Sequence, residues 1–100
     1  MGKFRANEDA NGPCDHLRGL TEADFPPQKT PGACEDCLRE GTQWVHLREC
    51  LTCGGVRCCD DSPERHATKH FHKTKHPVMR SVEPGERWTW CYVHQVGGEL

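Results

Sequence analysis

The sequence lacks any long hydrophobic run. No stretch approaches the ~20 apolar residues of a membrane-spanning helix, and residues 1–12, MGKFRANEDANG, contain no apolar segment typical of a secretory signal. We therefore expect no membrane association, a disordered tail over residues 1–12 and a cytoplasmic location. In a reducing compartment, clustered cysteines bind metal more often than they form disulfides.

Apolar residues and excess positive charge are also scarce. Hydrophobic residues make up 34% of the 100-residue chain, and this share includes eight cysteines. A domain of this size with so small a core usually needs disulfides or metal for stability. The formal net charge of −2 lacks the basic surplus of a dedicated nucleic-acid binder. Nucleic acid is therefore a disfavoured partner, although Lys69, Lys73 and Lys75 keep it as an alternative.

The residue patterns predict one small α+β domain over residues 13–95, with a short twisted antiparallel sheet and one main helix. The helix is expected at about residues 63–72, because Ser62 is a good N-cap and Pro63 suits the first helical position. Residues 96–100 are expected to be a loose C-terminal tail. Strands are expected at residues 44–50, 56–59, 77–82 and 87–93.

The eight cysteines and seven histidines are the candidate metal ligands. Cys34-x2-Cys37 and Cys50-x2-Cys53 form a strong zinc signal, because two intervening residues let both sulfurs reach one tetrahedral ion. A single four-cysteine ribbon would use both pairs, but it leaves the other cysteines and the histidine-rich stretch 66–76 unexplained.

Two better-known zinc patterns fit only in part. The spacing C-x2-C-x12-H-x3-H, which begins at Cys50, matches a DNA-reading finger, but Arg57 and Pro63 occupy the positions of its apolar core. A zinc protease also places two histidines four residues apart, as from His66 onward, and its general base is a glutamate directly after the first histidine. That position is Ala67, so no residue is placed to activate a zinc-bound water.

The motifs taken together resemble the ubiquitin-protease-type zinc finger, or ZnF-UBP domain, of deubiquitinating enzymes and of a histone deacetylase. The resemblance runs from Cys14 to His94. The chain resembles in particular the small stand-alone bacterial members of the family. Its motifs are CDH at 14–16, CEDC at 34–37, CLTC at 50–53, a cysteine five residues later, H-x3-H-x5-HP at 66–77, and W-C-x2-H at 90–94.

The resemblance implies up to three zinc ions per chain. The implied first site is Cys14, His16, Cys91 and His94; the second is Cys34, Cys37, Cys58 and His66; the third is Cys50, Cys53, His70 and His76. Cys59 is the alternative to Cys58 if the register differs by one residue. Each site has four protein ligands, as structural zinc sites do, so the resemblance implies a domain that is not an enzyme.

The family resemblance also implies a ligand pocket. Many members grip the free C-terminal Gly-Gly of ubiquitin between aromatic walls. Trp90 and Tyr92 match wall positions, Trp44 matches another family tryptophan, and Arg57 is a candidate substitute for a missing carboxylate clamp. Core packing is the alternative role for these aromatic residues.

The arginine that meets the ubiquitin carboxylate in the family is replaced here by Asp60, and Asp61 follows it. Two acids at that place repel a carboxylate, so ubiquitin tails are disfavoured. We expect a zinc-binding, non-enzymatic module that recognises a peptide or protein whose identity is unknown. A redox or zinc-handling protein that uses Cys59 is an alternative.

Overall fold

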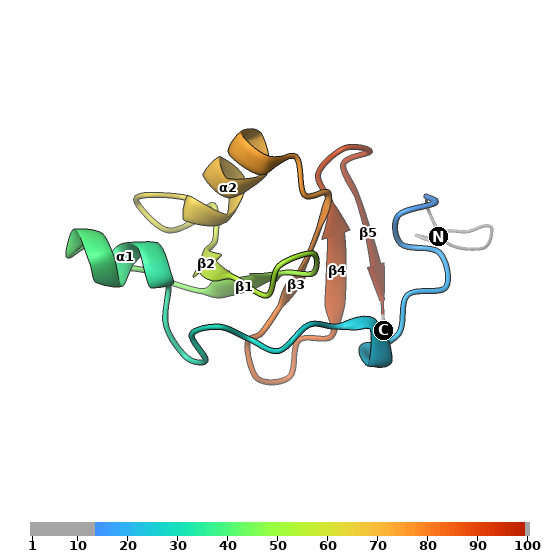
Figure 1. Cartoon of the computed structure of the whole chain (residues 1–100), viewed down its shortest axis with the longest axis horizontal. Helices are drawn as coiled ribbons and strands as arrows, with labels where there is room; N and C mark the ends of the chain where they lie inside the picture. The colour runs from blue at the N-terminus through green and yellow to red at the C-terminus, as the bar shows by residue number, and fades with distance from the viewer. Residues whose placement is uncertain (1–13, 100) are drawn as a thin grey trace.

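The computed structural model describes residues 14–99, so the tail expected over residues 1–12 lies outside the described residues. Five short strands form one antiparallel sheet in the order β2–β1–β3–β4–β5, and helix α2 packs against β1 and β2 (Figure 1). This arrangement confirms the predicted α+β class. The elements are η1 Glu22–Asp24, α1 Glu35–Glu40, β1 Leu47–Cys50, β2 Val56–Cys58, α2 His66–Thr74, β3 Val78–Ser81, β4 Trp88–Cys91 and β5 Val96–Glu99.

The four predicted strands are present but are shorter than expected. The differences are largest in β1, which begins at Leu47 after a loop at residues 44–46, and in β4, which spans only Trp88–Cys91. The Val45 amide donates to the Ser62 hydroxyl at 2.8 Å, outside the sheet ladder. None of the helices in residues 14–99 is long and apolar enough to cross a membrane.

The C-terminal segment corrects one prediction, since residues 96–99 form strand β5 and not a loose tail. β5 pairs with β4 in the register Thr89↔Gly98 and Trp90↔Gly97. A side chain at position 97 would lie 3.3 Å from the Thr89 carbonyl oxygen. Gly97 and Gly98 therefore allow the close approach of this edge strand to β4.

Helix α2 begins at His66 and not at Pro63, which corrects the predicted helix start. Ser62 does not cap the helix, because its hydroxyl accepts the Val45 amide. Arg65 is the N-cap residue, in the left-handed region at φ 49°. The His66 amide instead donates to Cys58 Sγ at 3.2 Å. A cysteine sulfur thus takes the place of the expected serine cap.

Helix α1 is an element that the sequence patterns did not indicate. It also begins at a cysteine: Cys34 is its N-cap, and Cys34 Sγ accepts the Cys37 amide at 3.3 Å. Gly41 ends the helix at φ 76°, a conformation that glycine adopts without steric cost. The C-x2-C stretch therefore places both sulfurs at one helix N-terminus.

The buried core consists of two small clusters rich in cysteine. One contains Cys34, Cys37, Leu47, Val56 and Cys58, and the other contains Cys14, Leu17, Val78 and Cys91. The sulfurs lie where a larger domain would have aliphatic side chains. Stability must therefore come in large part from what these sulfurs bind.

Candidate metal centres and binding pocket

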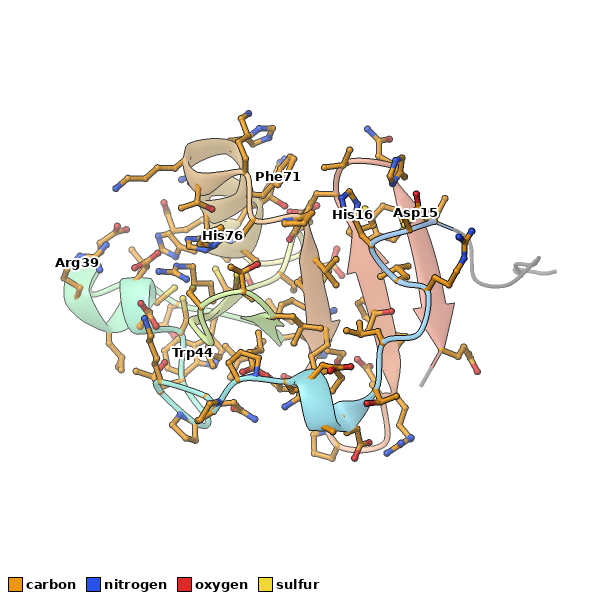
Figure 2. All side chains as sticks on the ribbon, turned by 45° about the vertical axis from the view of Figure 1, so that its right-hand side comes forward. Asp15, His16, Arg39, Trp44, Phe71 and His76 are labelled. Carbon is orange, nitrogen blue, oxygen red and sulfur yellow. The ribbon has the colours of Figure 1, made fainter. Side chains whose placement is uncertain are left out.

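The first metal cluster joins the start of the described chain to the end of β4. The ligand atoms of Cys14, His16, Cys91 and His94 all lie within 4.8 Å of one another. His16 Nδ1 is 3.2 Å and His94 Nδ1 3.6 Å from Cys91 Sγ. Figure 2 shows His16 near the turn that joins β4 to β5. Both histidines are exposed, so this is the most accessible of the three clusters.

The second cluster is completely buried and contains Cys34, Cys37, Cys58 and His66. His66 Nδ1 lies 3.4–3.5 Å from all three sulfurs, and the sulfurs of Cys37 and Cys58 are 3.8 Å apart. The structure places Cys58 in this cluster, while Cys59 lies elsewhere. The other ring nitrogen, His66 Nε2, is 2.9 Å from Glu40 Oε1, and such a carboxylate fixes the ring with Nδ1 toward a metal.

The third cluster lies beneath α2 and contains Cys50, Cys53, His70 and His76 (His76 is labelled in Figure 2). Cys50 Sγ is 3.4 Å from His76 Nδ1, and Cys53 Sγ is 3.6 Å from His70 Nε2. Burial, aided by the positive charge of Arg57 and by neighbouring His76, lowers the pKa of His70 to about 4. His70 is therefore neutral near pH 7, the form that coordinates metal.

These separations fit the tetrahedral zinc ion. With Zn–S bonds of about 2.3 Å and Zn–N bonds of about 2.0–2.1 Å, a tetrahedron has S–N edges of about 3.6 Å and S–S edges of about 3.8 Å. The S–N distances of 3.2–3.6 Å and the S–S distance of 3.8 Å in the clusters agree with these edges.

The electrostatics of the buried thiols also bear on metal binding. Burial raises the pKa of the thiols of Cys34, Cys50, Cys58 and Cys91, because desolvation disfavours the charged thiolate. A divalent ion among the sulfurs reverses this preference and holds them as thiolates. Geometry and donor chemistry therefore both fit zinc, and zinc is the cofactor of this domain.

A pocket of about 470 Å³ lies between α2 and the sheet. Trp90 and Tyr92 line it as predicted, together with Trp88 and Phe71, and the Tyr92 ring stacks on the Phe71 ring at 4.9 Å. Thr89 and Cys91, which alternate with these aromatic residues along β4, are 2% and 0% exposed. The small residues of β4 thus fill the interior, which leaves the aromatic face to form the pocket wall.

Two of the pocket candidates, Trp44 and Arg57, do not line this pocket. Trp44 packs against the buried cluster around Cys34 and Cys37, and Figure 2 shows it well separated from Phe71. Arg57 lines a small adjoining hollow and not the pocket itself. It reaches α1, where its Nε is 2.9 Å from an Asp36 carboxylate oxygen and its Nη2 is 3.0 Å from a Glu35 carboxylate oxygen. Its charge is therefore used to hold α1 against β2.

The pocket contains charged residues of both signs. Asp60 and Asp61 line it, as does Arg48, which the sequence patterns did not single out. The Arg48 guanidinium lies 4.6 Å above the Trp88 ring, donates to Ser81 Oγ at 3.3 Å and is 3.8 Å from a carboxylate oxygen of Glu86. Strand alternation could have placed Trp88 in the pocket, but the position of Arg48 follows from the pairing of β1 with β3.

A small α+β domain with three tetrahedral Cys/His clusters is a zinc finger. The model of the family described as "Zn-finger in ubiquitin-hydrolases and other protein" matches residues 34–96, and the chain belongs to this family. The resemblance seen in the sequence motifs is thereby confirmed.

Relatives of known name support the assignment. The chain is 37% identical over 84 residues to the NAD-dependent deacetylase sir2A of Dictyostelium discoideum. The matched region covers 79% of this chain and 15% of that protein. It is 34% identical to ubiquitin carboxyl-terminal hydrolase 44 of Ailuropoda melanoleuca, over 80% of this chain and 10% of the hydrolase. The chain therefore spans only a small part of these relatives.

A solved structure is also similar. The solution NMR structure of protein RPA1320 from Rhodopseudomonas palustris is 55% identical, with a TM-score of 0.63 over 74% of each chain.

Proposed function

We propose that this chain is a non-enzymatic binding module that recognises a peptide or protein segment through the pocket between α2 and β4. The observation that carries the proposal is the aromatic wall of a pocket of about 470 Å³, formed by Trp88 and Trp90 of β4 and by Tyr92, which follows this strand. Partly exposed aromatic residues that line a concave site are typical of ligand recognition.

The three clusters support a structural role for zinc. We assign Cys14, His16, Cys91 and His94 to the first ion, Cys34, Cys37, Cys58 and His66 to the second, and Cys50, Cys53, His70 and His76 to the third. Four protein ligands per ion leave no position for a reactive water at these sites. The named activities of the relatives belong to proteins of which this chain spans 10–15%.

The acidic pair Asp60 and Asp61 disfavours the free carboxylate of a ubiquitin tail as the ligand. Asp60 accepts a hydrogen bond from the Thr68 hydroxyl at 2.5 Å, and this bond holds the Asp60 carboxylate in position at the pocket. Arg48 is the guanidinium of the pocket lining, and Trp88, Ser81 and Glu86 already engage it. We expect nucleic acid and membranes not to be partners, and a reducing, cytoplasmic setting suits eight unpaired cysteines.

A peptide library with varied C-terminal and internal sequences tests the proposal. Zinc-loaded protein should retain a subset of peptides that Trp90→Ala does not retain, whereas Leu38→Ala, which changes an exposed residue of α1, should behave as the unmodified protein. If no peptide distinguishes the unmodified protein from Trp90→Ala, the pocket is not a peptide site.

A Gly-Gly-ended ubiquitin peptide tests the charge argument. The peptide is prepared in two forms, as a free acid and as a C-terminal amide. The two forms should bind with similar, weak affinity, because the pocket arginine, Arg48, is already engaged and does not meet the carboxylate. Tenfold or tighter binding of the free acid would show that Arg48 serves as a clamp.

A further inference from the structure

Cys59 is the cysteine that the three four-residue clusters do not use. Its side chain is nearly buried, at 5% exposure, and its sulfur is grouped with a ring nitrogen of His46 and a carboxylate oxygen of Asp61, all within 4.8 Å of one another. A thiol, an imidazole and a carboxylate are three different metal-binding groups, and they converge here from two separate segments.

The backbone brings these three residues together. The β1–β2 ladder ends at the pair Leu47↔Cys58, and the Cys59 amide then donates to the His46 carbonyl at 3.0 Å. The Ser62 amide donates to the Cys59 carbonyl at 3.0 Å, and this turn carries Asp61 back toward the sulfur. The grouping is therefore fixed by paired backbone and not only by side-chain rotamers.

The adjacent sulfurs of Cys58 and Cys59 belong to different surroundings. Consecutive residues of a strand point to opposite faces, so Cys58 enters the buried cluster while Cys59 lines the pocket together with Asp61. The Ser62 hydroxyl, 3.5 Å from Cys59 Sγ, accepts the Val45 amide. Its own hydrogen is thus available to the sulfur, as an outer partner of a metal-bound thiolate.

We propose that His46, Cys59 and Asp61 form a fourth metal site, which binds a divalent transition metal such as zinc or cobalt exchangeably at the wall of the pocket. Three protein ligands leave one coordination position for water or a bound ligand. This group has three protein ligands instead of four, and His46 and Asp61 are exposed to solvent, so this site binds more weakly than the other three and fills last.

Cobalt added to protein whose three tight sites hold zinc tests the site, because a thiolate–cobalt bond gives a charge-transfer band and tetrahedral cobalt gives strong visible bands. The unmodified protein should bind one equivalent of cobalt with the band of a single thiolate. Cys59→Ser should lose the band, and His46→Gln and Asp61→Asn should each weaken cobalt binding at least tenfold.

Matched controls separate this site from general charge and from the tight sites. Asp60→Asn and His72→Gln change a neighbouring acid and an exposed histidine outside the group, and both should bind cobalt as the unmodified protein does. Elemental analysis should still find three zincs in Cys59→Ser, which shows that the variant is folded. Absence of the thiolate band from the unmodified protein, or its persistence in Cys59→Ser, would overturn the proposal.

Discussion

The neighbouring cysteines Cys58 and Cys59 allow a sharp test of the ligand assignment. Cys58→Ser removes a sulfur whose neighbours are two other cysteine sulfurs and His66 Nδ1 at 3.4 Å, whereas Cys59→Ser changes a residue outside the three tight clusters. The two substitutions are chemically identical and one residue apart. Any difference in stability between the variants therefore reports which sulfur holds the buried zinc.

The magnitude follows from the zinc contribution. A structural zinc contributes an apparent ~10–16 kcal/mol with four ligands, so one ligand accounts for about 3 kcal/mol. Cys58 Sγ also accepts the His66 amide at the start of α2, a cap of about 1 kcal/mol. For a domain of this size, each kcal/mol shifts Tm by roughly 4–8 °C. Cys58→Ser should thus lower Tm by at least about 15 °C.

Cys59→Ser should lower the stability by no more than about 1 kcal/mol, since it is a small change at a site without a tight ion. Thermal melts followed by circular dichroism measure both variants, after dialysis against metal-free buffer has removed exchangeable metal. Elemental analysis should find close to three zincs in the unmodified protein and in Cys59→Ser, and fewer in Cys58→Ser. The reverse ranking of Tm would refute the assignment and make Cys59 the ligand.

Four further outcomes are expected. Arg57→Met should cost about 1–3 kcal/mol in a denaturant titration, because Glu35 loses its cationic partner and Asp36 keeps only the exposed Arg39. It should leave peptide binding unchanged; weaker peptide binding would place its guanidinium at the pocket. Asp60→Arg combined with Asp61→Tyr should tighten binding of a free-acid Gly-Gly peptide about tenfold by calorimetry, and no gain would mean that the pocket shape also excludes the peptide. The pKa of His70 is lowered to about 4 in the folded protein, so its contribution to stability is fully present above the pKa of about 6.5 in the unfolded chain and declines as the pH falls toward 4. Tm should fall over this pH range, with release of zinc to an indicator. A constant Tm would contradict a neutral His70 ligand. A strong chelator at pH 7 should abolish the near-ultraviolet dichroism of the tryptophans, and a retained signal would show a core that is stable without metal.

The sequence motifs, read through the family resemblance, pointed to twelve metal ligands. The structure brings these twelve residues together in the three expected groups. The interleaving, in which α2 supplies His66 to one cluster and His70 to another, could not follow from spacing alone. It depends on where β1 and β2 lie against the helix. The family resemblance supplied this division of the ligands among the clusters, and the local sequence patterns did not.

The errors arise where a tertiary contact overrides a local pattern. Ser62 has the features of a helix cap, but its hydroxyl accepts the Val45 amide from a segment 17 residues away. Gly97 and Gly98 are typical of a loose tail, yet they pair with β4. Arg57 seemed free to enter the pocket because helix α1, which carries its two carboxylate partners, was not predicted.

The clusters explain how so small a chain can leave aromatic residues partly exposed in a pocket. In most domains of this size, tryptophan and tyrosine are needed in the core, since they bury the largest apolar area. Here β4 directs Thr89 and Cys91 inward, and the Cys91 sulfur joins a metal cluster. Metal ligation thus supplies stability that the aromatic residues would otherwise provide. Trp90 and Tyr92 are only partly buried in this arrangement, and they form part of the pocket wall, where we propose that a partner binds.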